Sequence, residues 1–309
     1  MFVMALKNGE RKMNQFVPKL FDCMKSYTKE QFVKDVISGI IVAIIALPLS
    51  IALALASGVG PEQGIYTAIF AGFVISFLGG SNVQIVGPTA AFATIVAGIV
   101  ARNGMSGLAA ATIMAGILLI IMGFLKLGNL IRFIPYTITT GFTFGIAVTI
   151  LVGQIKDFLG LTFTNSPIDT VDKVKECINC IGTFNYQALI VGVVALAILI
   201  IFPKITEKIP PSLIAVIVTI VMVKMLKMDV KTIGDLYTIS NKLPSVSLPS
   251  INFTMIRELF PDALTIAVLA GIESLLSCVV ADGMVGSRHK PNMELVAQGA
   301  GNVVSALFG

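Results

Sequence analysis

The chain has 309 residues, of which 56% are hydrophobic and only 13% are charged, and its mean hydropathy is +0.92. Soluble domains carry about 25% charged residues. This composition therefore excludes an ordinary soluble enzyme and predicts an all-α protein that crosses the membrane many times. The net charge of +5 fits a basic inner face and anionic lipid headgroups, and no basic-aromatic array suggests a nucleic-acid partner.

The first 35 residues form a polar, basic segment. Basic segments are retained on the cytoplasmic side of membranes, so we expect a cytoplasmic N-terminus in a multi-pass protein of the cell inner (plasma) membrane. The apolar run that follows is too long and too far from the N-terminus to be a signal peptide. The pattern of residues 14–34 is typical of a helix lying on the membrane surface. The basic residues of this segment are Lys7, Arg11, Lys12, Lys19, Lys25, Lys29 and Lys34.

Runs without charge mark the membrane spans, each of which needs about 20 apolar residues. Eight such spans are predicted, and the start of a ninth lies near residue 294. The long run from 63 to 101 has room for two crossings, with a turn at 79–82. The predicted spans are 36–57, 64–79, 84–101, 107–126, 136–155, 187–203, 210–226 and 261–283.

The strongest local irregularity is the segment VQIVGPTAAF, residues 83–92. Pro88 disfavours a helical Gly87 and suits the first turn of a new helix. Only 13 residues then remain from Thr89 to Ala101, roughly 20 Å of helix, which is too short to span the core. Such a half-helix begins inside the membrane, where its free N–H groups and its dipole favour an anion. An ordinary span kinked at proline explains the motif equally well.

A second proline, Pro48, interrupts the first span. It removes one backbone hydrogen bond and frees the carbonyl group of Ile44. Together with Ser50 it predicts a polar notch facing Thr89, although a structural kink is the simpler explanation of an isolated proline. Two interrupted helices at corresponding depth are typical of the central site of a transporter.

Glu273 lies in the middle of the eighth span, eleven residues after Asp262 and nine before Asp282, in a run otherwise free of charge. Placing a carboxylate near the bilayer centre costs about 3 kcal/mol even on permissive insertion scales, so such residues usually mark ion or proton pathways. Ser277 shares its helix face, and a carboxylate beside a hydroxyl suits Na⁺ or a proton. The alternative is a protonated carboxyl group that is hydrogen-bonded within the bundle.

Other motifs carry less weight. Cys177 and Cys180 have the spacing of a redox pair or of two metal ligands, but neither a second cysteine pair nor a nearby histidine accompanies them in the sequence. An incidental pair is therefore favoured over a redox site. Because the loop is predicted to be external, a local disulfide is a further alternative. The spacing of Gly141 and Gly145 predicts close helix packing. The sequence contains neither a P-loop nor a nucleophile–base constellation. We therefore expect no enzyme activity, no cofactor and no metal site.

Several segments, in the same order along the chain, resemble the SulP (sulfate permease) family of anion transporters. The resemblance extends from about Pro18 to Gly309. The segments that carry it are 39–58 around ALPL (46–49), VQIVGPTAAF (83–92), TILVGQIKDFLGL (149–161), ESLLSCVVADGM (273–284) and SRHKPNMEL (287–295).

The resemblance implies a fold of fourteen spans in two inverted repeats of seven, divided into a core and a gate domain. It implies an N-terminal segment (1–35), core spans 1–4 (36–130), gate spans 5–7 with their loops (131–259), and core span 8 with a truncated span 9 (260–309). The sequence would thus hold the first repeat and the start of the second. Half of the family's anion site would be missing, so we expect an incomplete fragment that does not transport by itself. Family members also suggest a homodimer, and many carry a cytoplasmic STAS domain.

The resemblance also assigns roles to particular residues. The backbone around Thr89, Ala90 and Ala91, with Pro48 beside it, would bind sulfate or bicarbonate, and Glu273 and Ser277 would couple transport to Na⁺ or H⁺ by an elevator-type movement. Alternatives are a nucleobase transporter of the same architecture, an uncoupled anion channel or sensor, a membrane redox protein using Cys177 and Cys180, and a non-functional truncated product.

Overall fold

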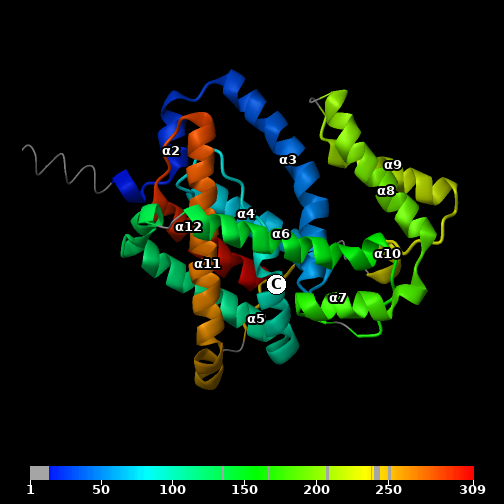
Figure 1. The fold of residues 1–309 in the computed structure, drawn as a ribbon. Coiled ribbons are helices and arrows are strands. Elements are labelled where there is room, and N and C mark those ends of the chain that lie inside the picture. The colour runs from blue at the N-terminus through cyan, green and yellow to red at the C-terminus, as the bar shows by residue number, and fades with distance from the viewer. Residues whose placement is uncertain are drawn as a thin grey trace, which may run out of the picture.

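The computed structural model describes residues 14–133, 136–165, 167–206, 209–237, 239, 244–249 and 252–309. Within these ranges all regular structure is helical, which confirms the all-α prediction (Figure 1). The α-helices are α2 (Lys19–Cys23), α3 (Lys29–Ala56), α4 (Pro61–Leu78), α5 (Ala93–Phe124), α6 (Tyr136–Phe158), α7 (Thr170–Asn179), α8 (Tyr186–Ile201), α9 (Pro211–Met225), α10 (Ile233–Leu236), α11 (Phe253–Val285) and α12 (Pro291–Phe308).

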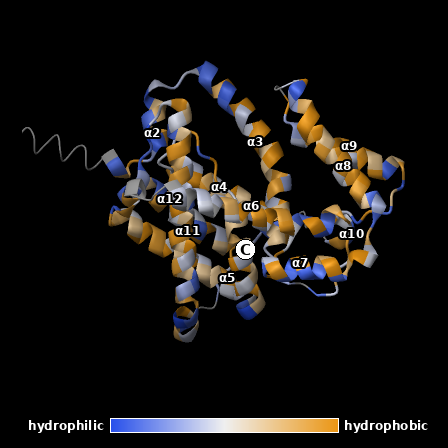
Figure 2. Cartoon of the chain, in the orientation of Figure 1, coloured by the Kyte–Doolittle hydropathy of each residue, from blue (hydrophilic) through white to orange (hydrophobic). Residues whose placement is uncertain are grey.

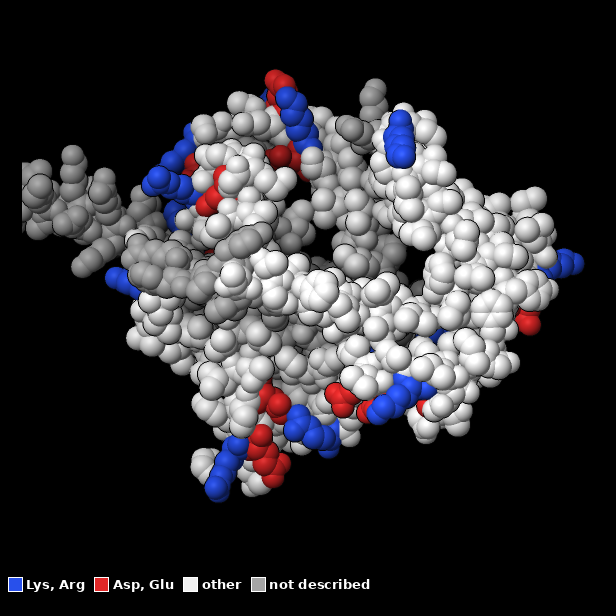
Figure 3. Space-filling model, viewed as in Figure 1, with Lys and Arg blue, Asp and Glu red and all other residues white. Residues whose placement is uncertain are grey.

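Each predicted span overlaps a helix, although the spans 84–101 and 107–126 both fall on α5 and residues 84–89 are not helical. In the described part of the chain, four helical stretches are long and apolar enough to cross a membrane: Lys29–Ala56, Ala90–Phe124, Tyr186–Lys204 and Phe253–Val285. In the visible face of Figure 3, charged side chains gather along the margins and leave a broad uncharged band between them. This distribution is the one expected of a chain that spans a bilayer.

Helices α3 and α11 begin well before their predicted spans, because polar caps extend them beyond their apolar runs. The side chain of Thr28 accepts a hydrogen bond from the Gln31 N–H group, and the Thr28 N–H group donates one to Oε1 of Gln31, so α3 starts seven residues before position 36. The side chain of Asn252 accepts a hydrogen bond from the Met255 N–H group at 2.7 Å and caps α11. As a result, α11 continues through Pro261.

A central bundle, defined here as α3, α4, α5, α11 and α12, contains most of the buried residues (Figure 1). Its interior includes Ile99, Leu119, Leu259 and Leu295, each at most 1% exposed. The remaining long helices, α6, α8 and α9, with the short α7, are called the outer helices. Of these, α8 and α9 pack mainly on each other, on the right of Figure 1, and Figure 2 shows that both are almost entirely hydrophobic.

Glycines allow a close contact in the central bundle, where α5 crosses α12. A Cβ atom added at Gly116 would lie 2.6 Å from the carbonyl oxygen of Gly299, and one added at Gly299 would lie 2.4 Å from that of Gly116. The prediction of close packing at Gly141 and Gly145 is wrong for the described residues, since no atom lies within 4 Å of a Cβ atom at either position. The spacing shows only that a close approach is allowed, and the packing partner decides whether it occurs.

Residues 14–26 pack against the end of the central bundle. Residues 14–26 form short helical turns and not one continuous surface helix. Lys290 donates hydrogen bonds to Asp22 at 2.6 Å and to the carbonyl oxygen of Val17 at 3.0 Å, and the Lys19 N–H group donates to the Gly79 carbonyl at 2.9 Å. Residues 14–26 are therefore tied to the end of α4 and to the loop before α12. Residues 80–89, which follow α4 without forming a helix, are called the extended segment.

Candidate functional site

The third predicted span is discontinuous, as the sequence indicated. After α4 the chain is not helical until the 3₁₀ turn Ala90–Phe92, which leads directly into α5. At Gly104 the backbone leaves the helical region (φ 68°, ψ −170°), so α5 consists of a short helix up to this point and a long one after it. The alternative of a span merely kinked at Pro88 is wrong, because the residues before that proline form no helix.

The N-terminus of this half-helix meets the intramembrane acid. Thr89 caps the 3₁₀ turn, and its hydroxyl oxygen accepts a long hydrogen bond from the Ala91 N–H group at 3.4 Å. The same hydroxyl donates to Oε1 of Glu273 at 2.6 Å. Glu273 lies in the middle of α11 and is half-buried. Two features that the sequence identified separately, 184 residues apart, are therefore in direct contact.

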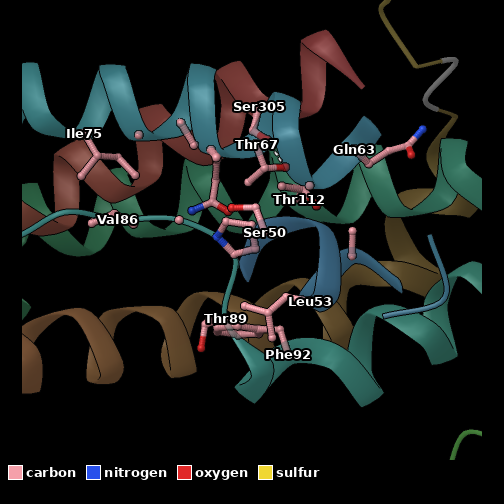
Figure 4. A pocket seen from close by; sticks show the side chains of 18 of the residues that line it. Ser50, Leu53, Gln63, Thr67, Ile75, Val86, Thr89, Phe92, Thr112 and Ser305 are labelled. Atoms are coloured by element: carbon pink, nitrogen blue, oxygen red, sulfur yellow. Dashed lines mark hydrogen bonds between the residues drawn. The ribbon is translucent and has the colours of Figure 1, made fainter. Parts of the chain in front are cut away.

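A cavity of about 1510 Å³ opens at this contact, among the helices of the central bundle. Thr89, Glu273, Ser277 and Ser50 all line it. In Figure 4 the side chain of Ser50 lies at the centre of the view, with Thr89 and Phe92 below it. Ser50 is 2% exposed, and its carbonyl oxygen would lie 2.2 Å from a Cβ atom at Gly64 of α4. This close approach of α3 to α4 holds Ser50 at the wall of the cavity.

The other predicted anion-site residues lie elsewhere. Ala90 and Ala91 line a separate recess of about 260 Å³, together with Gly145 and Thr149 of α6. Pro48 is not among the residues that line either cavity, and α3 passes through it as one continuous helix. The expected second interruption is therefore absent, because a 28-residue helix tolerates the single hydrogen bond that proline removes.

Sequence reasoning missed a polar network beside Glu273. Next to it on α11, Ser274 is buried and contacts Glu294 and Gln298 of α12 and Gln84 of the extended segment. Glu294 is 1% exposed although it borders a predicted loop. The available signal was the spacing of Glu294 and Gln298, which puts both on one helix face.

The cysteine pair lies far from this cavity, at the end of α7. Cys177 and Cys180 are buried free thiols, so the local disulfide is not formed. The thiol of Cys180 donates to Oε1 of Glu176 at 3.6 Å. Glu176 also accepts the N–H groups of Thr164 and Asn165, at 3.1 and 2.9 Å, and the Asn165 hydrogen bond lowers the pKa of this carboxyl group. The described residues contain no cluster of three or more His, Cys, Asp or Glu side chains that could hold a metal ion.

The chain is similar to known proteins in both sequence and structure. Over 287 residues the chain is 43% identical to "Putative sulfate transporter YvdB" of Bacillus subtilis (strain 168), covering 92% of this chain and 54% of that protein. It is 32% identical over 286 residues to "Bicarbonate transporter BicA" of Picosynechococcus sp., covering 89% of this chain and 50% of that protein. The chain thus spans about half the length of the curated relatives it matches.

Solved structures agree with these sequence relationships. The transmembrane domain of a cyanobacterium bicarbonate transporter BicA matches with a TM-score of 0.77 at 30% identity, covering 88% of this chain and 70% of that chain. Murine Solute Carrier 26 family member A9 matches with a TM-score of 0.81 at 18% identity, covering 96% and 54%, and so supports the fold alone. The model of the sulfate permease family matches residues 32–309. The chain therefore belongs to the sulfate permease family.

Proposed function

We propose that this protein carries out secondary active transport of a small inorganic anion, sulfate or bicarbonate, coupled to Na⁺ or H⁺. The observation that carries the proposal is the hydrogen bond of 2.6 Å between Thr89, at the start of the half-helix, and Glu273. The names of the relatives YvdB and BicA support the two substrates. Membership of the sulfate permease family favours an anion over a nucleobase.

The anion would lie at the N-terminus of the half-helix. The first N–H groups of a helix lack intrahelical partners, and the helix dipole places partial positive charge there. Backbone N–H groups at Ala90 and Ala91 would supply donors to the anion. The single Thr89 hydroxyl hydrogen is donated to Glu273 in the structure and would turn to the anion once Glu273 takes up a proton or Na⁺. Such donors recognise negative charge and suit both sulfate and bicarbonate.

The cation would bind at Glu273, with Ser277 as a further oxygen ligand on the same cavity wall. Two like unit charges 4 Å apart repel by about 4 kcal/mol at an effective dielectric constant of 20. An ionised Glu273 beside Thr89 would therefore weaken anion binding by roughly 100-fold or more. Na⁺ or H⁺ would remove this repulsion, and by thermodynamic linkage each ligand would strengthen binding of the other.

The movement would be of the elevator type, with residues 36–130 and 260–309, which contain most of the central bundle, as the core and residues 131–259 as the gate. The sparse contacts of α8 and α9 with the central bundle support this division. Lys19, Lys25, Arg288 and Lys290 lie where the N-terminal segment meets the loop before α12, which supports a cytoplasmic N-terminus in the plasma membrane. We expect a homodimer.

The test is uptake of labelled sulfate or bicarbonate into proteoliposomes that contain the full-length protein, under an imposed Na⁺ or pH gradient. Glu273→Gln should reduce gradient-driven accumulation to about 1% of the wild-type level, because the amide cannot take up charge. Glu258→Gln changes an exposed acid on the same helix and is the matched control. Full accumulation by Glu273→Gln would support an uncoupled channel or sensor, and uptake of uracil in place of the anions would support the nucleobase alternative.

A further inference from the structure

The carboxylate of Glu294 joins three separate elements in the interior of the central bundle. Its Oε2 atom accepts a hydrogen bond from the Gly80 N–H group at 2.9 Å. Its Oε1 atom accepts from the Ser274 hydroxyl and from Gln298 Nε2, each at 3.1 Å. Gln298 also donates to the Ser274 hydroxyl at 2.9 Å. Three donors from a loop, from α11 and from α12 therefore converge on one buried side chain.

The extended segment, defined as residues 80–89, has no helical hydrogen bonds of its own and is tied along α11 at three points. Glu294 bridges its first residue, Gly80, to Ser274. In its middle, Gln84 donates to the Ser274 hydroxyl at 3.1 Å and accepts from the Cys278 thiol. At its last residue, Thr89 donates to Glu273. The contacts at both ends therefore converge on two consecutive residues of α11.

The close contact at the start of α12 requires a glycine at position 80. A Cβ atom at this position would lie 2.2 Å from the carbonyl oxygen of Lys290 and 3.0 Å from the Glu294 nitrogen. Its carbonyl oxygen also accepts the Lys290 N–H group at 2.8 Å. Only a residue without a side chain lets the loop come this close to the start of α12.

We infer that Glu294 is a positioning residue, which sets the register of the extended segment against α11 and so holds Thr89 at Glu273. This inference rests on the proposed function of the Thr89–Glu273 contact. A carboxylate suits the role because it offers two acceptor oxygens, whereas an amide of the same length offers one. Hydrogen bonds to a charged acceptor are also roughly twice as strong as those between neutral groups.

A different role is conceivable at the same position, because Glu294 lies in the first turn of α12, where an acid also stabilises the helix dipole. Glu30 occupies the equivalent turn of α3, but its side chain is 79% exposed and forms only an i,i+4 pair with Lys34. Glu30→Gln is therefore the matched control for a contribution through the helix dipole alone.

The experiment measures the KM and Vmax of anion uptake by the full-length protein in proteoliposomes, with protein folding checked by thermal melting. Glu294→Gln keeps the length and removes one acceptor, and Glu294→Asp keeps the charge but is too short to bridge both partners. Both variants should raise the anion KM about tenfold, since misplacing a binding group by about 1 Å costs up to 100-fold. Glu30→Gln should leave KM unchanged. If Glu294→Gln does not fold, Glu294→Asp provides the same test.

A double-mutant cycle tests whether Glu294 acts through Thr89. In a Thr89→Val background, Glu294→Gln should raise KM less than twofold further, because the group to be positioned is already absent. If the KM of the double variant rises by the product of the two single increases, the two residues act independently and the inference is overturned. A Glu294 variant with reduced Vmax and an unchanged KM would also overturn it. If Glu294→Asp has wild-type kinetics, the charge alone is sufficient, and Glu294 has an electrostatic role and not a positioning role.

The same data separate this inference from the proposed function. If Thr89→Val itself leaves the anion KM and the cation dependence unchanged, the proposed function fails and the inference fails with it. If Thr89→Val changes them and the Glu294 variants do not, the positioning role alone is wrong.

Discussion

The central bundle and the outer helices are built from equally apolar sequences but bury them differently. In Ala90–Phe124 and in Phe253–Val285, 39% of the most apolar window is buried within the chain, against 6% in Tyr186–Lys204, which contains α8. Within the central bundle, Lys29–Ala56 (α3) is the exception, since only 6% of its window is buried. Helices that face lipid need only be apolar, whereas helices that pack on each other need small residues and satisfied polar groups. Hydropathy alone therefore cannot separate the two regions.

The buried polar side chains show the same contrast. In the central bundle they include Ser50, Ser274, Glu294 and Gln298, all at or next to the large cavity. Among the described residues from 136 to 249, Glu176 alone is a buried polar side chain, and it holds a loop. Buried polar groups are costly unless they are hydrogen-bonded, so their concentration in the central bundle is consistent with a functional site there.

The largest expected effect is at the crossing of α5 and α12. Gly299→Leu would place side-chain atoms where the Gly116 carbonyl oxygen lies, 2.4 Å from the new Cβ atom, so the two helices cannot remain packed. We expect no monodisperse folded protein in detergent by size-exclusion chromatography. Gly145→Leu on α6, where no atom lies within 4 Å, is the matched control and should fold. If the two variants give equal yields of folded protein, close packing is no more important in the central bundle than in the outer helices.

A smaller and local effect is expected at Glu176. Glu176→Ala leaves the N–H groups of Thr164 and Asn165 without their acceptor, so these amides should exchange hydrogen at least tenfold faster at pH 7, while the melting temperature falls by only a few degrees. The pKa of Glu176 is lowered in the folded state, chiefly by the Asn165 hydrogen bond. Its stabilisation is therefore complete above the unfolded pKa of about 4.3 and is lost as the pH falls through the lower folded value.

The pH dependence provides the check on this prediction. Hydrogen exchange of wild type and Glu176→Ala should differ at pH 7, and the difference should shrink as the pH falls below about 4.3 and through the lower folded pKa of Glu176. A difference that persists unchanged at low pH would show that the ionised carboxylate is not the cause. Faster exchange throughout the central bundle would show that the outer helices are not independent of it.

The smallest effect is expected at the rim of the central bundle. Arg102 donates to Asp262 at 2.9 Å, but the two side chains are 61% and 23% exposed. Exposed ion pairs contribute about 0.2–1 kcal/mol and are screened by salt. Arg102→Gln should therefore lower the melting temperature by about 1–3 °C at low salt and by less in 0.5 M NaCl. If the melting temperature falls by more than about 5 °C at every salt concentration, the Arg102–Asp262 pair contributes far more to the stability of the bundle than an exposed ion pair should.

Much of the fold could be predicted because membrane spans are local features. Apolar length located the helices, and the Gly87-Pro88 pair located the broken span, since proline acts on its own neighbours. Helix starts at Lys29 and Phe253 were missed, although the caps Thr28 and Asn252 were readable as signals. The effect of Pro48 was overestimated, because a proline removes one backbone hydrogen bond of a helix but does not by itself break the helix.

By itself, the sequence located the long apolar helices and their order and the start of the half-helix near Thr89, and it predicted that Glu273 lies near mid-membrane, because apolar length, proline and uncompensated charge act locally. Only the tertiary structure decided that Thr89 and Glu273 touch, that Gly116 and Gly299 form the close crossing, and that Glu294 is buried where an extended segment meets α11. Contacts between residues far apart in the chain depend on how whole helices pack, and no single segment encodes that packing.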